Sequence, residues 1–153
     1  VGDRRSETRR QRTDVREQMS DNGENTMTKQ INRPQDLEAY KAAYRLAMEI
    51  FHASKGWPRE ERYSLTDQIR RSSRSVCANL AEAWGKRRYV AHFTSKLTDA
   101  DGENLETQTW LNFARDCGYL DEGAFAEFIQ ASEEVGRLLG GMLAKPESFC
   151  LKS

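Results

Sequence analysis

The apolar residues between positions 37 and 145 recur at intervals of three and four, the spacing of amphipathic helices. The first such helix runs from Leu37 to about Lys55 and has two apolar faces. One face holds Leu37, Tyr40, Tyr44, Ala47, Met48 and Phe51, and the other holds Ala39, Ala43, Leu46 and Ile50. Because a helix with two apolar faces needs two partners, one of the two faces is a candidate contact with another subunit.

Three more helices follow. The segment "PREERYSLTDQ" opens a helix that ends near Gly85, a third helix runs from about Tyr89 to Cys117, and a fourth runs from Asp121 until Pro146 stops it. Their predicted core positions are Leu65, Ile69, Val76, Leu80 and Ala83; Phe93, Leu97, Ala100, Asn104, Leu111 and Ala114; and Phe125, Phe128, Ile129, Ser132, Val135, Leu139 and Leu143. Short connections between helices of this length predict an all-α, antiparallel up-down-up-down four-helix bundle over residues 35–146.

Two segments lie outside the predicted bundle. Residues 1–34 carry many charges and almost no large apolar side chain, which predicts a disordered N-terminal tail. Residues 147–153 are expected to form a flexible C-terminal tail. Gly136, Gly140 and Gly141 weaken the fourth helix, so either its end frays or a neighbouring backbone approaches it closely.

The inventory of chemically active residues argues against an enzyme. The three cysteines are far apart and form no CxxC pair, and the two histidines lie on different helices without metal-ligand spacing. No Glu is followed three residues later by His, as di-iron bundles require. We therefore expect no catalytic residue, no metal and no cofactor. The longest apolar stretches are too short for a membrane span, and without a secretory signal the expected location is the cytoplasm.

Charge is distributed unevenly along a chain whose net charge is zero. Residues 59–96 carry nine basic and four acidic side chains, whereas residues 97–153 carry four basic and eleven acidic ones. Clustered cations favour contact with phosphate backbones through counterion release. The candidate nucleic-acid-binding residues are Arg70, Arg71, Arg74, Lys86, Arg87 and Arg88. A solvated surface, or pairing with the acidic third helix, explains the same pattern equally well.

A polar edge adjoins the apolar arc of the second helix. It consists of Gln68, Ser75, Asn79 and Glu82. Side chains so close to the core are expected to be partly buried, and buried polar groups need hydrogen-bond partners. The pattern therefore predicts a polar interface network that fixes helix register.

Three segments carry a resemblance to a known family: "LEAYKAAYRLAMEIF", "WPREERYSLTDQIRRSSRSVCANLAEAWGKRR" and "FTSKLTDADGENLETQTWLNFARDCGYL". Over roughly residues 36–145 the chain resembles the small four-helix bundle proteins encoded in intervening sequences of 23S ribosomal RNA genes. The resemblance is most specific in the second helix, at Pro58, Glu61, Arg62, Leu65, Gln68, Ile69, Arg70, Arg71, Ser75, Asn79, Leu80, Ala81, Glu82 and Gly85. One departure is Ala83, where many relatives carry glycine.

The resemblance implies a bundle that assembles into a homopentamer and has no established catalysis. A similar protein, the accessory factor of diversity-generating retroelements, binds a reverse transcriptase and nucleic acid. RNA, DNA, a reverse transcriptase and a ribosomal component are thus the partners that the resemblance implies. The resulting hypothesis is a non-enzymatic, RNA-associated scaffold. The alternative is a protein–protein interaction module whose basic and acidic segments pair between subunits.

Overall fold

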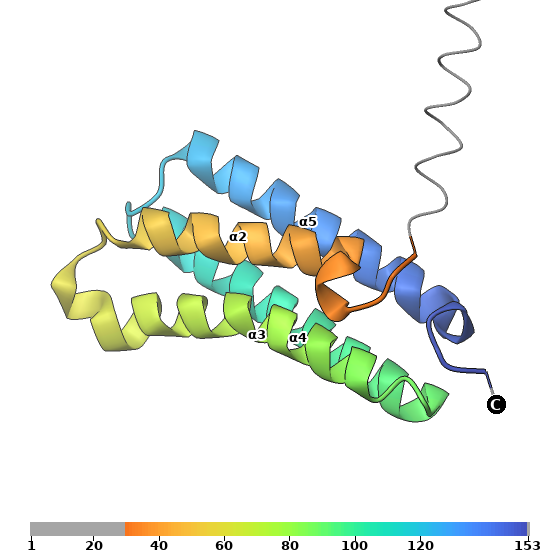
Figure 1. Cartoon of the computed structure of the whole chain (residues 1–153). Helices are drawn as coiled ribbons and strands as arrows, with labels where there is room; N and C mark the ends of the chain where they lie inside the picture. The colour runs from red at the N-terminus through yellow and green to blue at the C-terminus, as the bar shows by residue number, and fades with distance from the viewer. Residues whose placement is uncertain (1–29, 153) are drawn as a thin grey trace, which may run out of the picture. The chain divides into compact units, whose positions relative to one another are not determined.

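The computed structural model describes residues 30–152, and this part of the chain contains four long helices and no strand (Figure 1). The predicted N-terminal tail therefore lies almost entirely outside the described residues. Residues Arg33–Ser153 form one compact unit, which is described by itself. Its elements are η1 (Pro34–Asp36), α2 (Glu38–Ser54), η2 (Arg59–Glu61), η3 (Arg62–Thr66), α3 (Asp67–Gly85), α4 (Val90–Asp116), α5 (Glu122–Ala144) and η4 (Pro146–Ser148).

Each long helix packs against two others. Helix α3 contacts α2 and α4, and α5 also contacts α2 and α4. The pairs α2/α4 and α3/α5 therefore occupy diagonal corners of the bundle, as Figure 1 shows. The predicted cores of α3 and α4 are confirmed, since Ile69, Leu80, Phe93, Leu97 and Leu111 are all completely buried.

Helix α2 buries one of its two apolar faces completely and the other only in part. Ala39, Ala43, Leu46 and Ile50 of the inner face are buried, and so are Leu37 and Ala47 of the outer face. Tyr44 and Met48 of the outer face remain 54% and 38% exposed. The inner face is rich in small residues, which lets α2 approach its neighbours closely. Tyr44 and Met48 thus stay on the surface of the described part of the subunit.

The start of the second predicted helix is irregular. A 3-10 turn, η2, and a π-helical turn, η3, precede α3, so the regular helix begins only at Asp67. Leu65 and Thr66 nevertheless reach the core. The wider π turn adds one residue per hydrogen-bonded ring, which rotates these side chains inward before the α-helical period begins.

The turn between α4 and α5 is formed by local chemistry. Gly118 has a φ of +80°, a conformation that other residues rarely adopt, and the Tyr119 N–H donates to the Ala114 carbonyl at 2.8 Å. Asp121 then caps α5, since its Oδ1 accepts from the Ala124 N–H at 2.7 Å. Together they connect α4 to α5 within five residues of sequence.

Buried polar side chains connect α4 to both neighbouring helices. The Ser72 and Thr107 hydroxyls share a hydrogen bond of 2.9 Å between α3 and α4. Between α4 and α5, Asn104 Nδ2 donates to the Ser132 carbonyl at 2.9 Å, and Ser132 Oγ donates back to Asn104 Oδ1 at 2.9 Å. Gln108 Nε2 donates to the same Ser132 Oγ at 3.0 Å. Ser72, Asn104, Thr107 and Ser132 are fully buried, so these pairings help to satisfy them, and the Ser72 and Thr107 hydroxyls also lie within hydrogen-bond distance of carbonyls of their own helices.

The C-terminal segment folds back on the bundle. After η4, the Phe149 ring stacks on Phe93 with centroids 6.1 Å apart, and the Leu151 N–H donates to the Arg87 carbonyl at 3.1 Å. These contacts bring residues 149–151 next to the turn between α3 and α4. The expected flexibility of residues 147–153 stays a prediction.

The glycines near the end of α5 permit a stability prediction. Helix α5 continues through Gly140 and Gly141 to Ala144, and no atom lies within 4 Å of a Cβ added at either glycine. The expectations of a frayed end or a close backbone approach at these two positions are therefore wrong.

Gly140→Ala should raise the free energy of unfolding by about 0.5–1 kcal/mol, because alanine loses less conformational entropy in a helix. Urea titration followed by circular dichroism measures this difference. Gly118→Ala is the matched control and should destabilise, since its φ is positive. No gain in Gly140→Ala would mean that the last turns of α5 are not helical in solution.

Candidate nucleic-acid interface

Three cations gather around the ring of Phe51, which lies near the end of α2. Lys55 Nζ is 4.7 Å from the ring centroid, Arg70 Cζ is 4.9 Å from it and Arg74 Cζ is 5.6 Å from it. Lys55 comes from α2's C-cap and the arginines from successive turns of α3. We call Lys55, Arg70 and Arg74 the cation cluster. The face of an aromatic ring attracts cations, so Phe51 helps to hold them together.

Arg70 is fixed in place by a buried partner. Its Nε donates to Ser54 Oγ at 2.8 Å, and this hydroxyl donates to the Phe51 carbonyl at 3.1 Å. Ser54 is only 2% exposed. The guanidinium of Arg70 is therefore oriented by the α2–α3 contact, whereas Lys55 and Arg74 are exposed.

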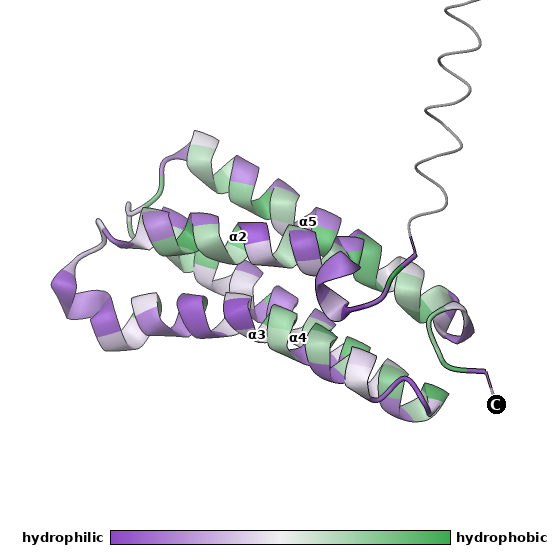
Figure 2. Ribbon diagram, in the orientation of Figure 1, coloured by the Kyte–Doolittle hydropathy of each residue, from purple (hydrophilic) through white to green (hydrophobic). Residues whose placement is uncertain are grey.

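No carboxylate neutralises the cation cluster within the described residues. None of Lys55, Arg70 and Arg74 has an acidic group of the described residues within ion-pair distance. Like charges held this close repel one another, and a bound anion relieves that repulsion. Figure 2 shows that the first turns of α3 consist mainly of hydrophilic residues. This geometry suits a phosphate.

Arg71 lies on a different side of α3. Its Nη2 is 2.8 Å from Glu106 Oε1 on α4, and its Nη1 is 3.8 Å from Glu103 Oε1. Burial of the carboxyl raises the pKa of Glu103, neighbouring Glu106 raises this pKa further, and Arg71 lowers it. Arg71 is therefore occupied by a partly buried pair of carboxyls and does not join the cation cluster.

Lys86, Arg87 and Arg88 form a third group at the turn between α3 and α4. The Arg87 guanidinium lies 3.9 Å above the Trp84 ring, and Nη1 donates to the Trp84 carbonyl at 2.8 Å. Arg88 lies 5.9 Å from the Tyr89 ring centroid. About 20 Å of helix separates this turn from Arg74. The six residues predicted from sequence thus fall into three separate places.

Sequence reasoning missed Lys55. Lys55 follows Phe51 by four residues, so the sequence alone indicates that the two side chains share one edge of α2. That this edge faces Arg70 and Arg74 follows only from the packing of α2 on α3.

The predicted polar edge of α3 is only partly connected. Asn79 Nδ2 donates to the carbonyl and to Oγ of Ser75 at 3.0 and 3.2 Å, and Glu82 Oε2 is 2.8 Å from Lys96 Nζ on α4. The side chain of Gln68 makes no hydrogen bond with another described residue, and Glu82 is exposed. The hydrogen bonds that cross between helices in the core belong instead to Ser72, Thr107, Asn104, Gln108 and Ser132. Whether the polar edge serves as an interface stays a prediction.

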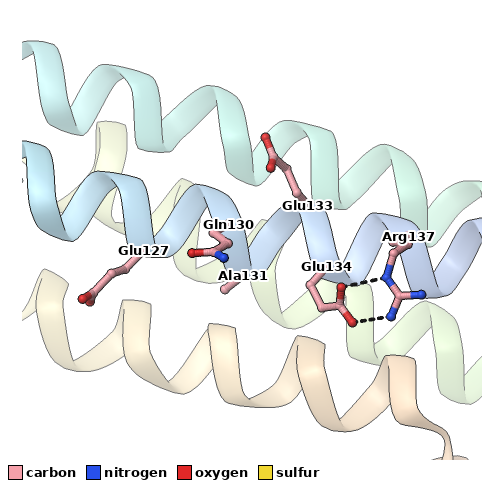
Figure 3. Close-up of a pocket in the computed structure, with 6 residues that line it drawn as sticks. All are labelled: Glu127, Gln130, Ala131, Glu133, Glu134 and Arg137. Atoms are coloured by element: carbon pink, nitrogen blue, oxygen red, sulfur yellow. Dashed lines mark hydrogen bonds and ion pairs between the residues drawn. The ribbon is translucent and has the colours of Figure 1, made fainter.

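The exposed face of α5 is acidic, in contrast to the cation cluster. A shallow depression of about 550 Å³ is lined by Glu127, Gln130, Ala131, Glu133, Glu134 and Arg137. Figure 3 shows Arg137 turned toward Glu134, and Arg137 Nε donates to Glu134 Oε2 at 2.8 Å. Arg137, the one cationic residue among those that line the depression, is therefore already paired with a carboxylate. The depression is a poor site for an anion.

Two further observations concern residues 30–152. Within this range no three His, Cys, Asp or Glu side chains come together in a way that would hold a metal ion. Among the helices of the same range, none has the length and apolar character needed to cross a membrane.

Comparison with known proteins places this fold in a family. The model of the 23S rRNA-intervening sequence proteins matches residues 35–141. The chain belongs to this family. Residues 35–141 of this intervening sequence protein span all of α2, α3 and α4 and most of α5, so the resemblance seen in the sequence is confirmed.

A solved structure from a related family supports the same assignment. The chain is similar to a protein of unknown function from the S23 ribosomal protein family of Bacteroides thetaiotaomicron, with a TM-score of 0.63 and 26% identity. The match covers 69% of this intervening sequence protein and 95% of the Bacteroides chain. A comparison with curated proteins finds no match.

Glu103 permits a test of the carboxyl pair beside Arg71. Its pKa is raised above the ordinary value of 4.5, so the folded state holds the proton more tightly than the unfolded state does. The contribution of this group to stability therefore falls as pH rises from the ordinary pKa through the raised one. Glu103→Gln cannot titrate. The free energy of unfolding of Glu103→Gln relative to wild type should rise with pH across this window.

Urea titrations at several pH values between about 4 and 7 measure this difference. Glu134→Gln is the control of opposite sign: the hydrogen bond from Arg137 lowers the pKa of Glu134, so the free energy of unfolding of this variant relative to wild type should fall as pH rises. A difference for Glu103→Gln that stays constant or shrinks with rising pH would contradict the proposed burial of this carboxyl.

Proposed function

We propose that this intervening sequence protein is a non-enzymatic scaffold, an up-down-up-down bundle assembled as a homopentamer, that binds RNA through phosphate contacts. The observation that supports this function best is the cation cluster. Lys55, Arg70 and Arg74 converge on Phe51, and no described carboxylate lies within ion-pair distance of them.

The energetics of the cation cluster suit a polyanion better than a single small ion. An open surface with three cations binds one phosphate only weakly in water, because solvent and salt screen each charge. A nucleic-acid backbone presents many phosphates, and the release of its condensed counterions drives binding. Several copies of the cluster in one oligomer would add their contributions on one strand.

The family name supports RNA over DNA, since it refers to sequences that interrupt 23S ribosomal RNA. The name of the Bacteroides relative's family likewise refers to the ribosome. A ribosomal component or a reverse transcriptase is a further partner consistent with an RNA-bound scaffold. The expected location is the cytoplasm.

The second candidate function is a protein–protein module without a nucleic-acid role. One observation favours it: the exposed carboxylates of α5, Glu127 and Glu133, have no ion-pair partner within the described residues. They are available to the cation cluster of a neighbouring subunit. Against it, several basic and acidic groups already pair within one subunit, as Arg71 does with Glu106 and Lys96 with Glu82.

The decisive experiment reverses the charge of the two exposed members of the cation cluster and leaves Arg70 and its buried partner Ser54 unchanged. Lys55→Glu combined with Arg74→Glu leaves the Arg70–Ser54 hydrogen bond in place. We expect this double variant to bind a fluorescein-labelled single-stranded RNA of about 20 nucleotides at least tenfold more weakly than wild type at low salt. Fluorescence anisotropy measures the affinity, and the slope of log affinity against log salt should become shallower.

Two controls locate the effect. Arg137→Glu changes a cation that is already paired on α5 and should leave RNA affinity within about twofold of wild type. Lys86→Glu combined with Arg88→Glu tests the turn between α3 and α4. Wild-type protein that fails to bind RNA even at low salt, or equal losses in all three variants, would refute the assignment. If the cluster variant instead dissociates the oligomer, the protein–protein module is the better account.

A further inference from the structure

The turn between α3 and α4 presents an aromatic ring to solvent. Tyr89, the N-cap residue of α4, is 58% exposed, and its side chain makes no capping hydrogen bond. The His92 ring meets the Tyr89 ring in a T-shaped contact with centroids 5.4 Å apart, and Arg88 Cζ lies 5.9 Å from the Tyr89 centroid. Lys86 is exposed beside them. We call Lys86, Arg88, Tyr89 and His92 the turn surface.

The cations of the turn surface have no carboxylate partner within the described residues. Residues 83–98 contain four basic side chains and no acidic one. The acidic residues that border this segment, Glu82 and Asp99, both pair with Lys96, at 2.8 and 3.6 Å. Glu147, the acidic residue of the nearby η4, makes no ion pair with the turn. The turn surface therefore keeps its positive charge.

The turn is held in place by its neighbours. Arg87 Nη1 donates to the Trp84 carbonyl at 2.8 Å while the guanidinium lies over the Trp84 ring. The Leu151 N–H donates to the Arg87 carbonyl at 3.1 Å, and the Tyr89 N–H donates to the Lys86 carbonyl at 3.2 Å. Figure 1 shows the turn at one end of the bundle, beside the C-terminal segment. A surface that is ordered in advance loses less conformational entropy when it binds a ligand.

This combination of groups suits an unpaired nucleotide. Bases of a single strand stack on exposed aromatic rings, and cations beside the ring contact the adjoining phosphates. In an A-form duplex the bases are stacked on one another and paired, so a protein ring cannot reach their faces. An exposed tyrosine between unpaired cations therefore favours single-stranded RNA over duplex RNA.

Tyr63 shows that exposure alone does not make such a site. It is 77% exposed, and Arg62 Cζ lies 5.5 Å from its ring centroid. However, residues 58–67 carry three acidic side chains and two basic ones. The nearby Glu61 accepts a hydrogen bond from Ser64 at 2.9 Å. Carboxylates next to a stacked base repel its phosphates, so the surroundings favour Tyr89 over Tyr63.

We propose that the turn surface binds an unpaired nucleotide of single-stranded RNA, with the base stacked on Tyr89 and the adjoining phosphates on Lys86 and Arg88. This inference rests on the proposed function and adds to it a preference for unpaired strands. The cation cluster, separated from the turn by about 20 Å of helix, contacts phosphates alone and so accepts paired and unpaired RNA alike. The two sites therefore differ in what they recognise.

Two substitutions of Tyr89 test the stacking. Wild type, Tyr89→Ala and Tyr89→Phe are titrated with a fluorescein-labelled single-stranded RNA of about 20 nucleotides and with the same strand annealed to its complement, at low salt. Tyr89→Ala should weaken single-strand binding at least fivefold, since one base–aromatic stack corresponds to about 5- to 150-fold in affinity. Duplex binding should change by less than about twofold, because the ring does not reach paired bases.

The conservative variant and the salt dependence identify the interaction. Tyr89→Phe keeps the ring and should stay within about twofold of wild type for both forms of RNA. Tyr89→Ala removes no charge, so its slope of log affinity against log salt should equal that of wild type. Lys86→Glu combined with Arg88→Glu should instead make this slope shallower.

Tyr63→Ala is the matched control, because Tyr63 is exposed and lies outside the turn surface. Its affinity for both forms of RNA should equal that of wild type. The backbone hydrogen bonds of Tyr89 persist in Tyr89→Ala, so far-ultraviolet circular dichroism and thermal unfolding should show an intact bundle.

Three results would overturn the inference. They are an unchanged ratio of single-strand to duplex affinity in Tyr89→Ala, an equal loss for both forms, and a loss in Tyr89→Phe as large as in Tyr89→Ala. A Tyr89→Ala protein with an altered oligomeric mass would make the turn a protein contact instead.

The proposed function fails separately. If Lys55→Glu combined with Arg74→Glu binds RNA as wild type does while Tyr89→Ala loses single-strand binding, the cation cluster is not the phosphate site and the stacking stands. If the cluster variant loses binding and Tyr89→Ala does not, the stacking alone is wrong. Wild-type protein that binds neither form of RNA would remove both proposals.

Discussion

The buried hydrogen bonds at the middle of α4 fix how this bundle is put together. Apolar side chains pack in several registers of similar energy, because burial of surface has no direction. A buried amide favours the register that supplies its partner, since an unsatisfied group costs about 1–3 kcal/mol. The Ser72 and Thr107 hydroxyls can also bond to carbonyls of their own helices, and they gain a hydrogen bond between helices only in this register. Ser72 with Thr107 and Asn104 with Ser132 impose this requirement on both sides of α4. Helix α4 therefore sets the positions of α3 and α5.

The surface follows from this register. Once Ser72 meets Thr107, the neighbouring Arg71 points toward Glu106 on α4, and Arg70 and Arg74 turn toward α2. The same rotation of α3 thus neutralises one arginine and leaves two unneutralised beside Phe51. On α4, the face opposite these polar contacts is free to carry Leu105 and Phe113 outward. The core contacts and the two surfaces are consequences of one arrangement.

The sequence predicted the helices well because the period of 3.6 residues is a local property. In the core of α3, Ile69, Val76 and Leu80 were predicted correctly, although the buried Cys77 was not assigned to it. On α5, Leu143 was predicted to be in the core but is only half-buried, and Met142 is buried instead. The choice between the two faces of α2 was not available from the pattern, since both are apolar. Only packing shows that small residues such as Ala39 and Ala43 are buried and that Tyr44 is left outside. The irregular turns before Asp67 likewise have no periodic signal.

The candidate site was harder to predict, for a physical reason. Clustering of basic residues along the sequence does not determine which of them share a surface, because one residue rotates a helix by 100°. Arg70 and Arg71 are neighbours in sequence, but Arg70 contacts α2 and Arg71 contacts α4. Lys55 is distant in sequence and completes the cluster. Of the polar residues predicted to fix register, Asn79 bonds to Ser75 within its own helix and Glu82 reaches Lys96 of α4 at the surface. The bonds between helices in the core are made by residues such as Thr107 and Ser132.

The most direct test of this account is a double-mutant cycle on the hydrogen bond between α3 and α4. Ser72→Ala and Thr107→Val each remove one hydroxyl at a fully buried position while changing the side-chain volume little. Each single change should lower the free energy of unfolding by about 0.5–1.5 kcal/mol, because it removes the hydrogen bond across the interface and leaves the other hydroxyl only a carbonyl of its own helix. The double variant should lose clearly less than the sum, with a coupling of about 1 kcal/mol in urea titrations. Additive losses, with a coupling near zero, would contradict the claim that this contact fixes the bundle's register.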